Sequence, residues 1–284
     1  MSVWEALILG VVQGITEFLP VSSSGHLVLL DTILGIREPT LAFHTAIHMG
    51  TLAAVVSVLR RDIWNLIRNI AQPLTLYLII GTIPTVIAAL LFMDLIEQAF
   101  ASAAPLGFAF LVTSALLVVS DKLYHRNEKP GGLPAKLASP AQPRLQSEMN
   151  WVDALVIGVF QAVAIVPGIS RSGATISAAL SRRLDRDFSA RFSFLLSIPA
   201  ILGATVLHLR ELGEIARGGI MAAEGTIGLL PLLVGTVSAG VVGFFAVRFT
   251  IKIVRERSLA GFAVYTGALG ILVLTDQFIT NFVF

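Results

Sequence analysis

The sequence is poor in charge and has no cysteine. Asp, Glu, Lys and Arg make up only 13% of its 284 residues, against about 25% in an ordinary soluble domain. Hydrophobic residues make up 55%, and the mean hydropathy is +0.84. This composition excludes a soluble domain and predicts a membrane protein that crosses the bilayer several times. Without cysteine, disulfides, thiolate catalysis and cysteine metal sites are also excluded.

The N-terminus lacks the basic region of a signal peptide, and Gln13 and Glu17 interrupt the apolar run that follows it. We therefore expect this region to belong to the mature fold.

Long apolar windows free of Asp, Glu, Lys and Arg predict the membrane spans, since a crossing helix needs about 20 mostly apolar residues. Six windows meet or nearly meet this length: Pro39–Leu59, Asn69–Met93, Gln98–Ser120, Phe192–Leu209, Gly225–Val247 and Ser258–Thr275. The predicted fold class is an all-α polytopic membrane protein.

Four other apolar pieces are too short to cross or are broken by a charged residue. They are Ala6–Thr16, Phe18–Leu30, Ala154–Ser170 and Ser172–Ser181. Each pair meets at a tip rich in Pro, Gly and Ser, a pattern typical of discontinuous helices around a midplane site. We interpret each pair as a re-entrant hairpin that enters and leaves on the same side of the membrane.

The two hairpins are copies of one another. A shift of 148 residues lays Glu5–Gly25 over Asp153–Gly173 without gaps and matches Gln13 with Gln161. A re-entrant hairpin does not cross the membrane, so each copy crosses it three times. Because three is an odd number, the second copy starts on the opposite side and must be inverted. We predict two inverted repeats, residues 1–120 (hairpin about 4–30) and residues 151–284 (hairpin about 152–182), joined by a linker at residues 121–150.

Positive charge is unevenly distributed between the predicted loops. Sixteen of the 20 lysines and arginines fall in loops on the side opposite the N-terminus, and only Arg37, Arg210 and Arg217 fall on the N-terminal side. The positive-inside rule then places the linker in the cytoplasm and both termini outside it.

The second tip has the residues of an anion site. The half-helix after each tip begins with Ser, Gly and Thr, and helix N-termini present unpaired N–H groups to anions. Arg171, the twentieth basic residue, lies inside this tip, and its planar guanidinium suits a phosphate group. The alternative for the serines is capping and small-residue packing.

Glu17 and His26 are the ionisable residues of the first stretch. Glu17 lies one helical turn after Gln13, so a carboxylate and an amide share a face that can hold a divalent cation or a base. An ion pair with Arg171 is the alternative. His26 follows Ser23 by three residues, the spacing of an activated nucleophile, although it can instead bond a neighbouring carbonyl. His44 and His48 are interpreted as packing residues or as residues that support the side chains of the site, with His48 the one facing the site.

Two motifs resemble the BacA-type undecaprenyl-diphosphate phosphatase family, the bacitracin resistance proteins. They are Q-G-I-T-E-F-L-P-V-S-S-S-G-H at residues 13–26 and P-G-I-S-R-S-G-A-T at residues 167–175. The first motif begins with Glu or Gln in the family and with Gln13 here.

The resemblance implies a hydrolase in the bacterial inner membrane, with its active site facing the exterior. Its substrate would be the polyprenyl diphosphate lipid released in cell-wall synthesis, cleaved to the monophosphate carrier and phosphate with help from Mg²⁺ or Ca²⁺. Gln13 and Glu17 would hold that metal. No nucleic-acid partner is predicted, and a homodimer is left open.

Besides metal binding, the predicted mechanism gives the site residues two roles. Glu17, Ser23, His26 and Arg171 are the candidate catalytic residues, and Gln13, Ser22, Ser24, Ser170, Ser172 and Thr175 the candidate substrate-binding residues. Ser23 would attack phosphorus with Glu17 or His26 as base, and attack by a water is the alternative.

A rival function is an inverted-repeat transporter or a flippase of the carrier lipid. The acid phosphatase family is excluded, because His208 is followed four residues later by Leu212 and not by Asp.

Overall fold

The computed structural model describes residues 1–36, 41–92, 95–96, 98–99, 105–128, 143–217, 227–280 and 283. The described elements are helical apart from an isolated bridge between Arg144 and Leu184. The helices are α1 (Val3–Thr16), α2 (Ser23–Ile33), α3 (Leu41–Val58), α4 (Arg60–Arg68), α5 (Pro73–Leu91), α7 (Leu106–Glu128), α8 (Trp151–Val163), α9 (Arg171–Ser181), α10 (Arg186–Arg217), α11 (Leu229–Glu256) and α12 (Ala260–Thr275).

Six of these helices are long and apolar enough to cross a membrane: α3, α5, α7, α10, α11 and α12. Each corresponds to one of the six predicted apolar windows, so the predicted all-α, multi-pass membrane fold is confirmed. The short helix α4 was not predicted. It carries Trp64 and Ile67 among three arginines, which explains why the search for uncharged windows passed over it.

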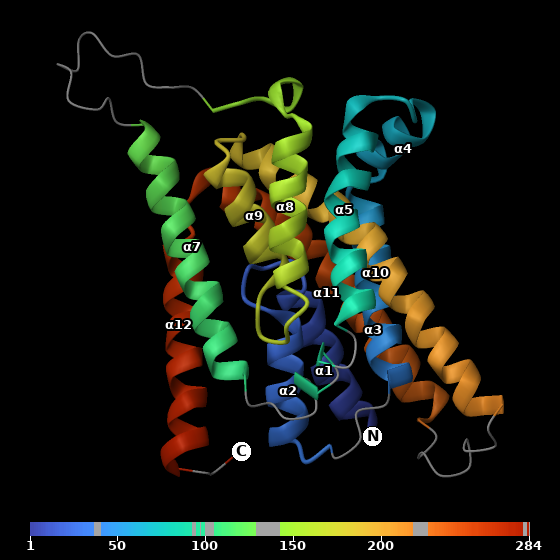
Figure 1. The fold of residues 1–284 in the computed structure, drawn as a ribbon. Helices are drawn as coiled ribbons and strands as arrows, with labels where there is room; N and C mark the ends of the chain where they lie inside the picture. The colour runs from blue at the N-terminus through green and yellow to red at the C-terminus, as the bar shows by residue number, and fades with distance from the viewer. Residues whose placement is uncertain are drawn as a thin grey trace, which may run out of the picture.

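The four remaining helices form two pairs that turn back half-way through the bundle. Helices α1, α2, α8 and α9 have 14, 11, 13 and 11 residues, and at about 1.5 Å per residue none reaches 30 Å. In Figure 1, α1 and α8 start at opposite ends of the bundle, and the loop after each lies near its middle. This is the arrangement that inverted hairpins require.

The division into repeats at residues 121–150 stays a prediction, and residues 129–142 of that linker lie outside the described part of the chain.

Close helix packing holds the two hairpins among the longer helices. A Cβ added at Gly158 of α8 would lie 2.4 Å from the carbonyl oxygen of Gly81 in α5. A Cβ added at Gly10 of α1 would lie 2.4 Å from the carbonyl oxygen of Gly235 in α11. Membrane helices approach this closely only where small residues line the contact.

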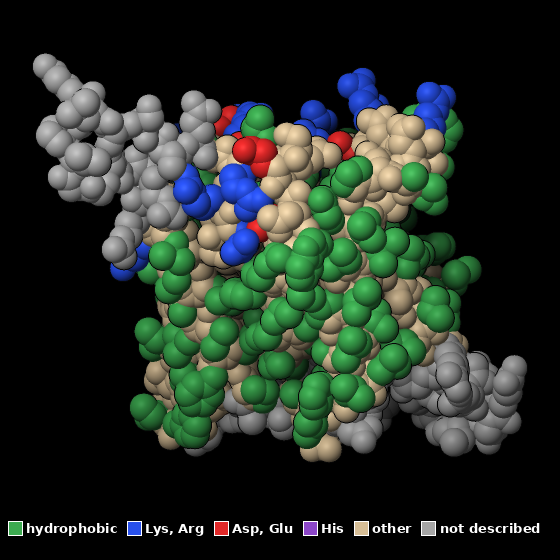
Figure 2. Space-filling view, turned by 45° about the horizontal axis from the view of Figure 1, so that its top comes forward, with side chains coloured by type: hydrophobic (Ala, Val, Ile, Leu, Met, Phe, Trp, Pro, Cys, Tyr) green, Lys and Arg blue, Asp and Glu red, His purple; other side chains and the backbone are tan. Residues whose placement is uncertain are grey.

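Basic side chains gather at one end of the molecule, above a flank covered by hydrophobic side chains (Figure 2). Asp153, at the start of α8, is fully buried there and pairs with Arg144 at 2.8 Å and Arg182 at 2.7 Å. The hydrogen bond to Asp153 raises the pKa of Arg144. These pairs hold the end of the linker against the loop after α9.

Candidate active site

Backbone conformations that are rare for most residues shape both hairpin tips. Ser22, the N-cap of α2, has φ +72°, a region that non-glycine residues seldom adopt and that costs energy. Gly168 has φ +93° in the tip before α9, where a glycine bears no such cost. Strain of this kind persists where the surroundings hold the chain in place, and Ser22 is buried.

The two tips touch one another. The backbone N–H of Gly168 donates to Ser24 Oγ at 3.3 Å, and the Ser172 hydroxyl donates to the Leu19 carbonyl at 2.9 Å. Thr113 of α7 accepts a hydrogen bond from the Ser170 N–H at 2.9 Å. Helices α2 and α9 therefore begin side by side, although about 148 residues separate them in the sequence.

Glu17 is the centre of a polar network that brings together four of the predicted residues. Arg171 forms an ion pair with its Oε1 atom. The Ser23 hydroxyl donates to its Oε2 atom at 2.6 Å, and Gln13 Nε2 donates to the same atom at 3.0 Å. A carboxylate, a hydroxyl, an amide and a guanidinium thus meet where the two hairpins touch.

This network is mostly buried but can be reached from outside. The Glu17 side chain is 5% exposed and that of Arg171 is 16% exposed, while Ser23 and Ser24 are half-buried. Arg171 Nη1 is buried without a hydrogen-bond partner. The first N–H groups of α2 and α9 have no acceptor within their own helix and add positive potential. The site therefore has spare donors that suit an oxyanion.

His26 does not contact Ser23. Its Nδ1 atom lies 2.6 Å from the Ser22 carbonyl, and its Nε2 atom lies 2.7 Å from the hydroxyl of Tyr265 in α12. Since a carbonyl only accepts, Nδ1 carries the proton and Nε2 accepts from Tyr265. Of the two interpretations of His26, the structure has the bond to a neighbouring carbonyl. The Ser23 hydroxyl donates to Glu17 instead, and a catalytic role for His26 stays a prediction.

The other predicted hydroxyls mainly hold the tips in place. Ser22 and Ser170 cap α2 and α9 by accepting from the N–H groups of Gly25 and Gly173. The Thr175 hydroxyl is fully buried and lies 2.6 Å from that of Ser193 in α10. Their predicted role in substrate binding stays a prediction.

The sequence did not reveal all the residues around the network. His48 lies with Nε2 3.8 Å from Glu17 Oε2, the orientation expected of it, although it was not among the predicted site residues. Tyr265 and Thr113 were missed, because a single polar residue within an apolar span has no sequence signal that identifies its partner.

The site has oxygen donors that fit a hard divalent cation. Gln13 Oε1 is buried without a hydrogen-bond partner, and the Nε2 atom of the same amide donates to Glu17. In the described part of the chain, no three His, Cys, Asp or Glu side chains are placed to hold a metal ion. One carboxylate and one amide oxygen are a donor set that suits Mg²⁺, which is bound by one or two carboxylates together with substrate phosphates.

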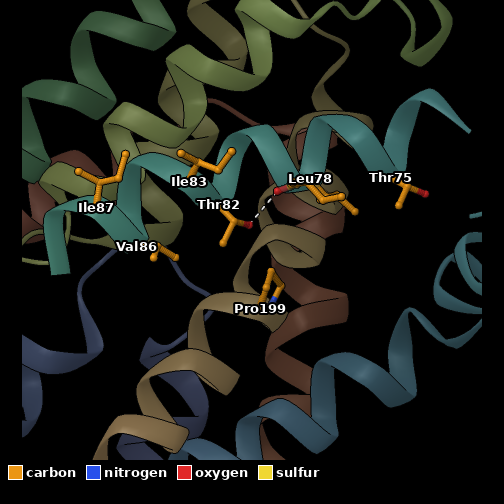
Figure 3. Close-up of a pocket in the computed structure, with 8 residues that line it drawn as sticks. Thr75, Leu78, Thr82, Ile83, Val86, Ile87 and Pro199 are labelled. Atoms are coloured by element: carbon orange, nitrogen blue, oxygen red, sulfur yellow. Dashed lines mark hydrogen bonds between the residues drawn. The ribbon is translucent and has the colours of Figure 1, made fainter. Parts of the chain in front are cut away.

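An apolar groove of about 360 Å³ lies apart from this network, between α5 and α10. Figure 3 shows Leu78, Ile83 and Ile87 of α5 along it, with Pro199 of α10 opposite. The Thr82 hydroxyl is used within α5, where it donates to the Leu78 carbonyl at 2.7 Å. The groove suits hydrocarbon and offers no charged group for chemistry.

Fold and site together define an integral membrane protein in which a buried carboxylate, a guanidinium and a serine hydroxyl meet where two short helices begin. The family model "Bacitracin resistance protein BacA" matches residues 6–272. The chain belongs to this family.

Curated relatives agree along nearly the whole chain. The chain is 42% identical to "Undecaprenyl-diphosphatase" of Carboxydothermus hydrogenoformans, over 98% of both chains. It is 43% identical to "Undecaprenyl-diphosphatase 4" of Bacillus thuringiensis subsp. konkukian, over 96% of this chain and 97% of the relative. It is 36% identical to "Undecaprenyl-diphosphatase" of Halothermothrix orenii, over 96% and 98%.

Proposed function

We propose that the protein is a membrane phosphatase that hydrolyses undecaprenyl diphosphate to undecaprenyl phosphate and inorganic phosphate. One observation carries this proposal: Glu17 accepts the Ser23 hydroxyl on one carboxylate oxygen and pairs with Arg171 through the other. The nucleophile Ser23, the base Glu17 and the phosphate-binding guanidinium of Arg171 therefore already lie together. The names of the relatives supply the substrate.

Arg171 has a second role when substrate binds. Its unpartnered Nη1 and the N–H groups at the starts of α2 and α9 bind the terminal phosphate. As the guanidinium turns toward the phosphate, its hold on Glu17 weakens and the carboxylate becomes more basic. Substrate binding thus prepares the base.

The reaction proceeds through a serine ester. Glu17 removes the proton of Ser23 Oγ as this oxygen bonds the terminal phosphorus, and the P–O–P bond breaks to release undecaprenyl phosphate. Water then attacks the phosphoserine, and the bond between phosphorus and Ser23 Oγ breaks. Glu17 returns its proton to Ser23 Oγ, while inorganic phosphate and the proton lost by the water leave to solvent. Direct attack by a water molecule held by Glu17 is the competing route.

A divalent cation, Mg²⁺ or Ca²⁺, would be held by Gln13 and Glu17. When bound, it would neutralise phosphate charge in the transition state. Every group proposed here comes from one chain, so a homodimer is not needed for the chemistry.

The basic end of the bundle faces the cytoplasm of a bacterial inner membrane in this proposal, and both termini face the exterior. The distribution of Lys and Arg supports this orientation. The polyprenyl tail stays in the hydrocarbon while the head group reaches the two tips from the outer side.

Phosphate release by the purified protein in detergent tests the function. Wild-type protein should release phosphate from undecaprenyl diphosphate without any membrane gradient, and Arg171→Ala should reduce this by at least about a hundredfold. Thermal unfolding would show that the variant is folded. A folded wild-type protein that releases no phosphate, yet moves the lipid across vesicles, would favour the rival transporter or flippase.

A further inference from the structure

His48 of α3 presents its Nε2 atom toward the Glu17 network. Its Nδ1 atom lies 2.7 Å from the carbonyl oxygen of His44, one turn earlier in the helix. A carbonyl only accepts hydrogen bonds, so Nδ1 carries the proton and Nε2 of the neutral ring carries the lone pair. The helix backbone thus fixes the tautomer that can bind a metal ion.

The position of this nitrogen matches that of a ligand to a shared cation. His48 Nε2 lies 3.8 Å from Glu17 Oε2. Two ligands that each lie about 2.1 Å from one metal ion are about 3.0 Å apart when adjacent and about 4.2 Å apart when opposite. The His48 side chain is one-third exposed, at 33%, so an ion can reach it.

Gln13 supplies an independent sign of a missing ligand. Its side chain is fully buried, and its Oε1 atom has no hydrogen-bond partner. A buried acceptor without a donor costs about 1–3 kcal/mol. Its Nε2 atom already touches Glu17 Oε2 at 3.0 Å, so turning the amide over would place Oε1 beside that carboxylate oxygen. A cation there would satisfy the amide oxygen.

We propose that His48 is a third protein ligand of the divalent cation, with Gln13 and Glu17. The inference rests on the proposed function and deepens it, because it predicts which metals the site prefers. Imidazole suits transition metals, whereas Ca²⁺ takes oxygen ligands. A site with one nitrogen and two oxygens should therefore prefer Mn²⁺ to Ca²⁺.

A simple ion pair is the competing explanation for the contact. A protonated His48 would donate toward Glu17 and would bind no metal ion, since its lone pair would be occupied. This explanation leaves Gln13 Oε1 without a partner.

Cation binding without substrate separates the two explanations. The purified protein would be stripped with chelator, and its affinity for Mn²⁺ and for Ca²⁺ measured by calorimetry. We expect His48→Gln to weaken Mn²⁺ binding by about tenfold or more and to change Ca²⁺ binding by less than about twofold. His208→Gln is the matched control, because His208 contacts Thr45 and not Glu17. Equal Mn²⁺ affinity in His48→Gln and wild type would overturn the proposal.

A spectroscopic measurement on the unmodified protein does not depend on the folding of a variant. Electron spin-echo modulation of bound Mn²⁺ should reveal one coordinated ¹⁴N nucleus. Bound Mn²⁺ without nitrogen modulation, or no Mn²⁺ binding, would overturn the assignment of His48. Phosphate release from undecaprenyl diphosphate is measured separately, so the proposed function can survive either result.

Discussion

Arg171 and Glu17 form a largely buried ion pair, although 154 residues separate them in the chain. Each residue lies in one hairpin tip, so the pair joins the two halves of the molecule. Burying two charges is costly unless they are paired and hydrogen-bonded. Glu17 meets this condition, since both of its oxygens are bonded, while Arg171 keeps an unpartnered Nη1. The ion pair therefore holds the two tips together, and Arg171 still has a free N–H donor for the substrate.

Glu17→Gln should abolish most activity. The amide is no base for Ser23, so kcat should fall about 10²–10⁴-fold, and Arg171 loses its partner, which costs about 3–5 kcal/mol. Phosphate release and thermal unfolding would measure the two effects. Glu5→Gln, in the first turn of α1, the helix that Glu17 caps at its other end, should stay within about twofold of wild type. Wild-type kcat in Glu17→Gln would remove Glu17 from the mechanism.

Ser23→Ala and Ser24→Ala should differ although the residues are neighbours. Ser23 is the proposed nucleophile, whereas Ser24 accepts the Gly168 N–H, a bond worth about 0.5–1.5 kcal/mol. Rapid quenching with labelled substrate should trap phosphate on wild type and on Ser24→Ala, but not on Ser23→Ala. Turnover without any trapped label in wild type would favour direct attack by water.

His26→Ala should retain more activity than Glu17→Ala, by about tenfold or more. Both ring nitrogens of His26 are already used, by Ser22 and Tyr265, and neither reaches Ser23. Comparison of kcat/KM for the two variants checks this expectation. Equal losses would mean that the imidazole leaves Tyr265 during the reaction and acts as a base.

Gly158→Ala should destabilise the protein by about 1–3 kcal/mol, because its Cβ would lie 2.4 Å from the Gly81 carbonyl oxygen and would push α5 and α8 apart. Gly203→Ala, inside α10, is the control. Apart from its chain neighbours and the nearby backbone of its own helix, no described atom lies within 4 Å of its added Cβ. Removing this helical glycine should therefore stabilise the protein by about 0.5–1 kcal/mol. Thermal unfolding in detergent measures both changes, and similar shifts in the two variants would contradict the packing argument.

The membrane spans could be predicted because the physics behind them is local. A crossing helix must be about 20 apolar residues long, and that length can be read directly from the chain. The tips were equally visible, since Pro20, Gly168 and the serines break the apolar runs. Helix α4 was missed because its arginines fall within the apolar pattern.

The direction of individual side chains could not be predicted in the same way. Spacing placed His26 one turn from Ser23, but the ring turns toward Tyr265, which is 239 residues away. The serines of the second tip suited either phosphate binding or capping, and in the structure Ser170 caps a helix while Ser172 donates to the Leu19 carbonyl. Several partners within reach compete for each hydroxyl, and only the packed structure selects one.

The sequence by itself determined that this is a multi-pass membrane protein with two interrupted hairpins and an arginine at one tip. Apolar length, helix-breaking residues and intramembrane charge are properties of short segments. The tertiary structure alone decided that Glu17, and not His26, accepts the Ser23 hydroxyl, and that His48 faces the same carboxylate. Those contacts join helices far apart in the chain, and their choice depends on how the helices pack.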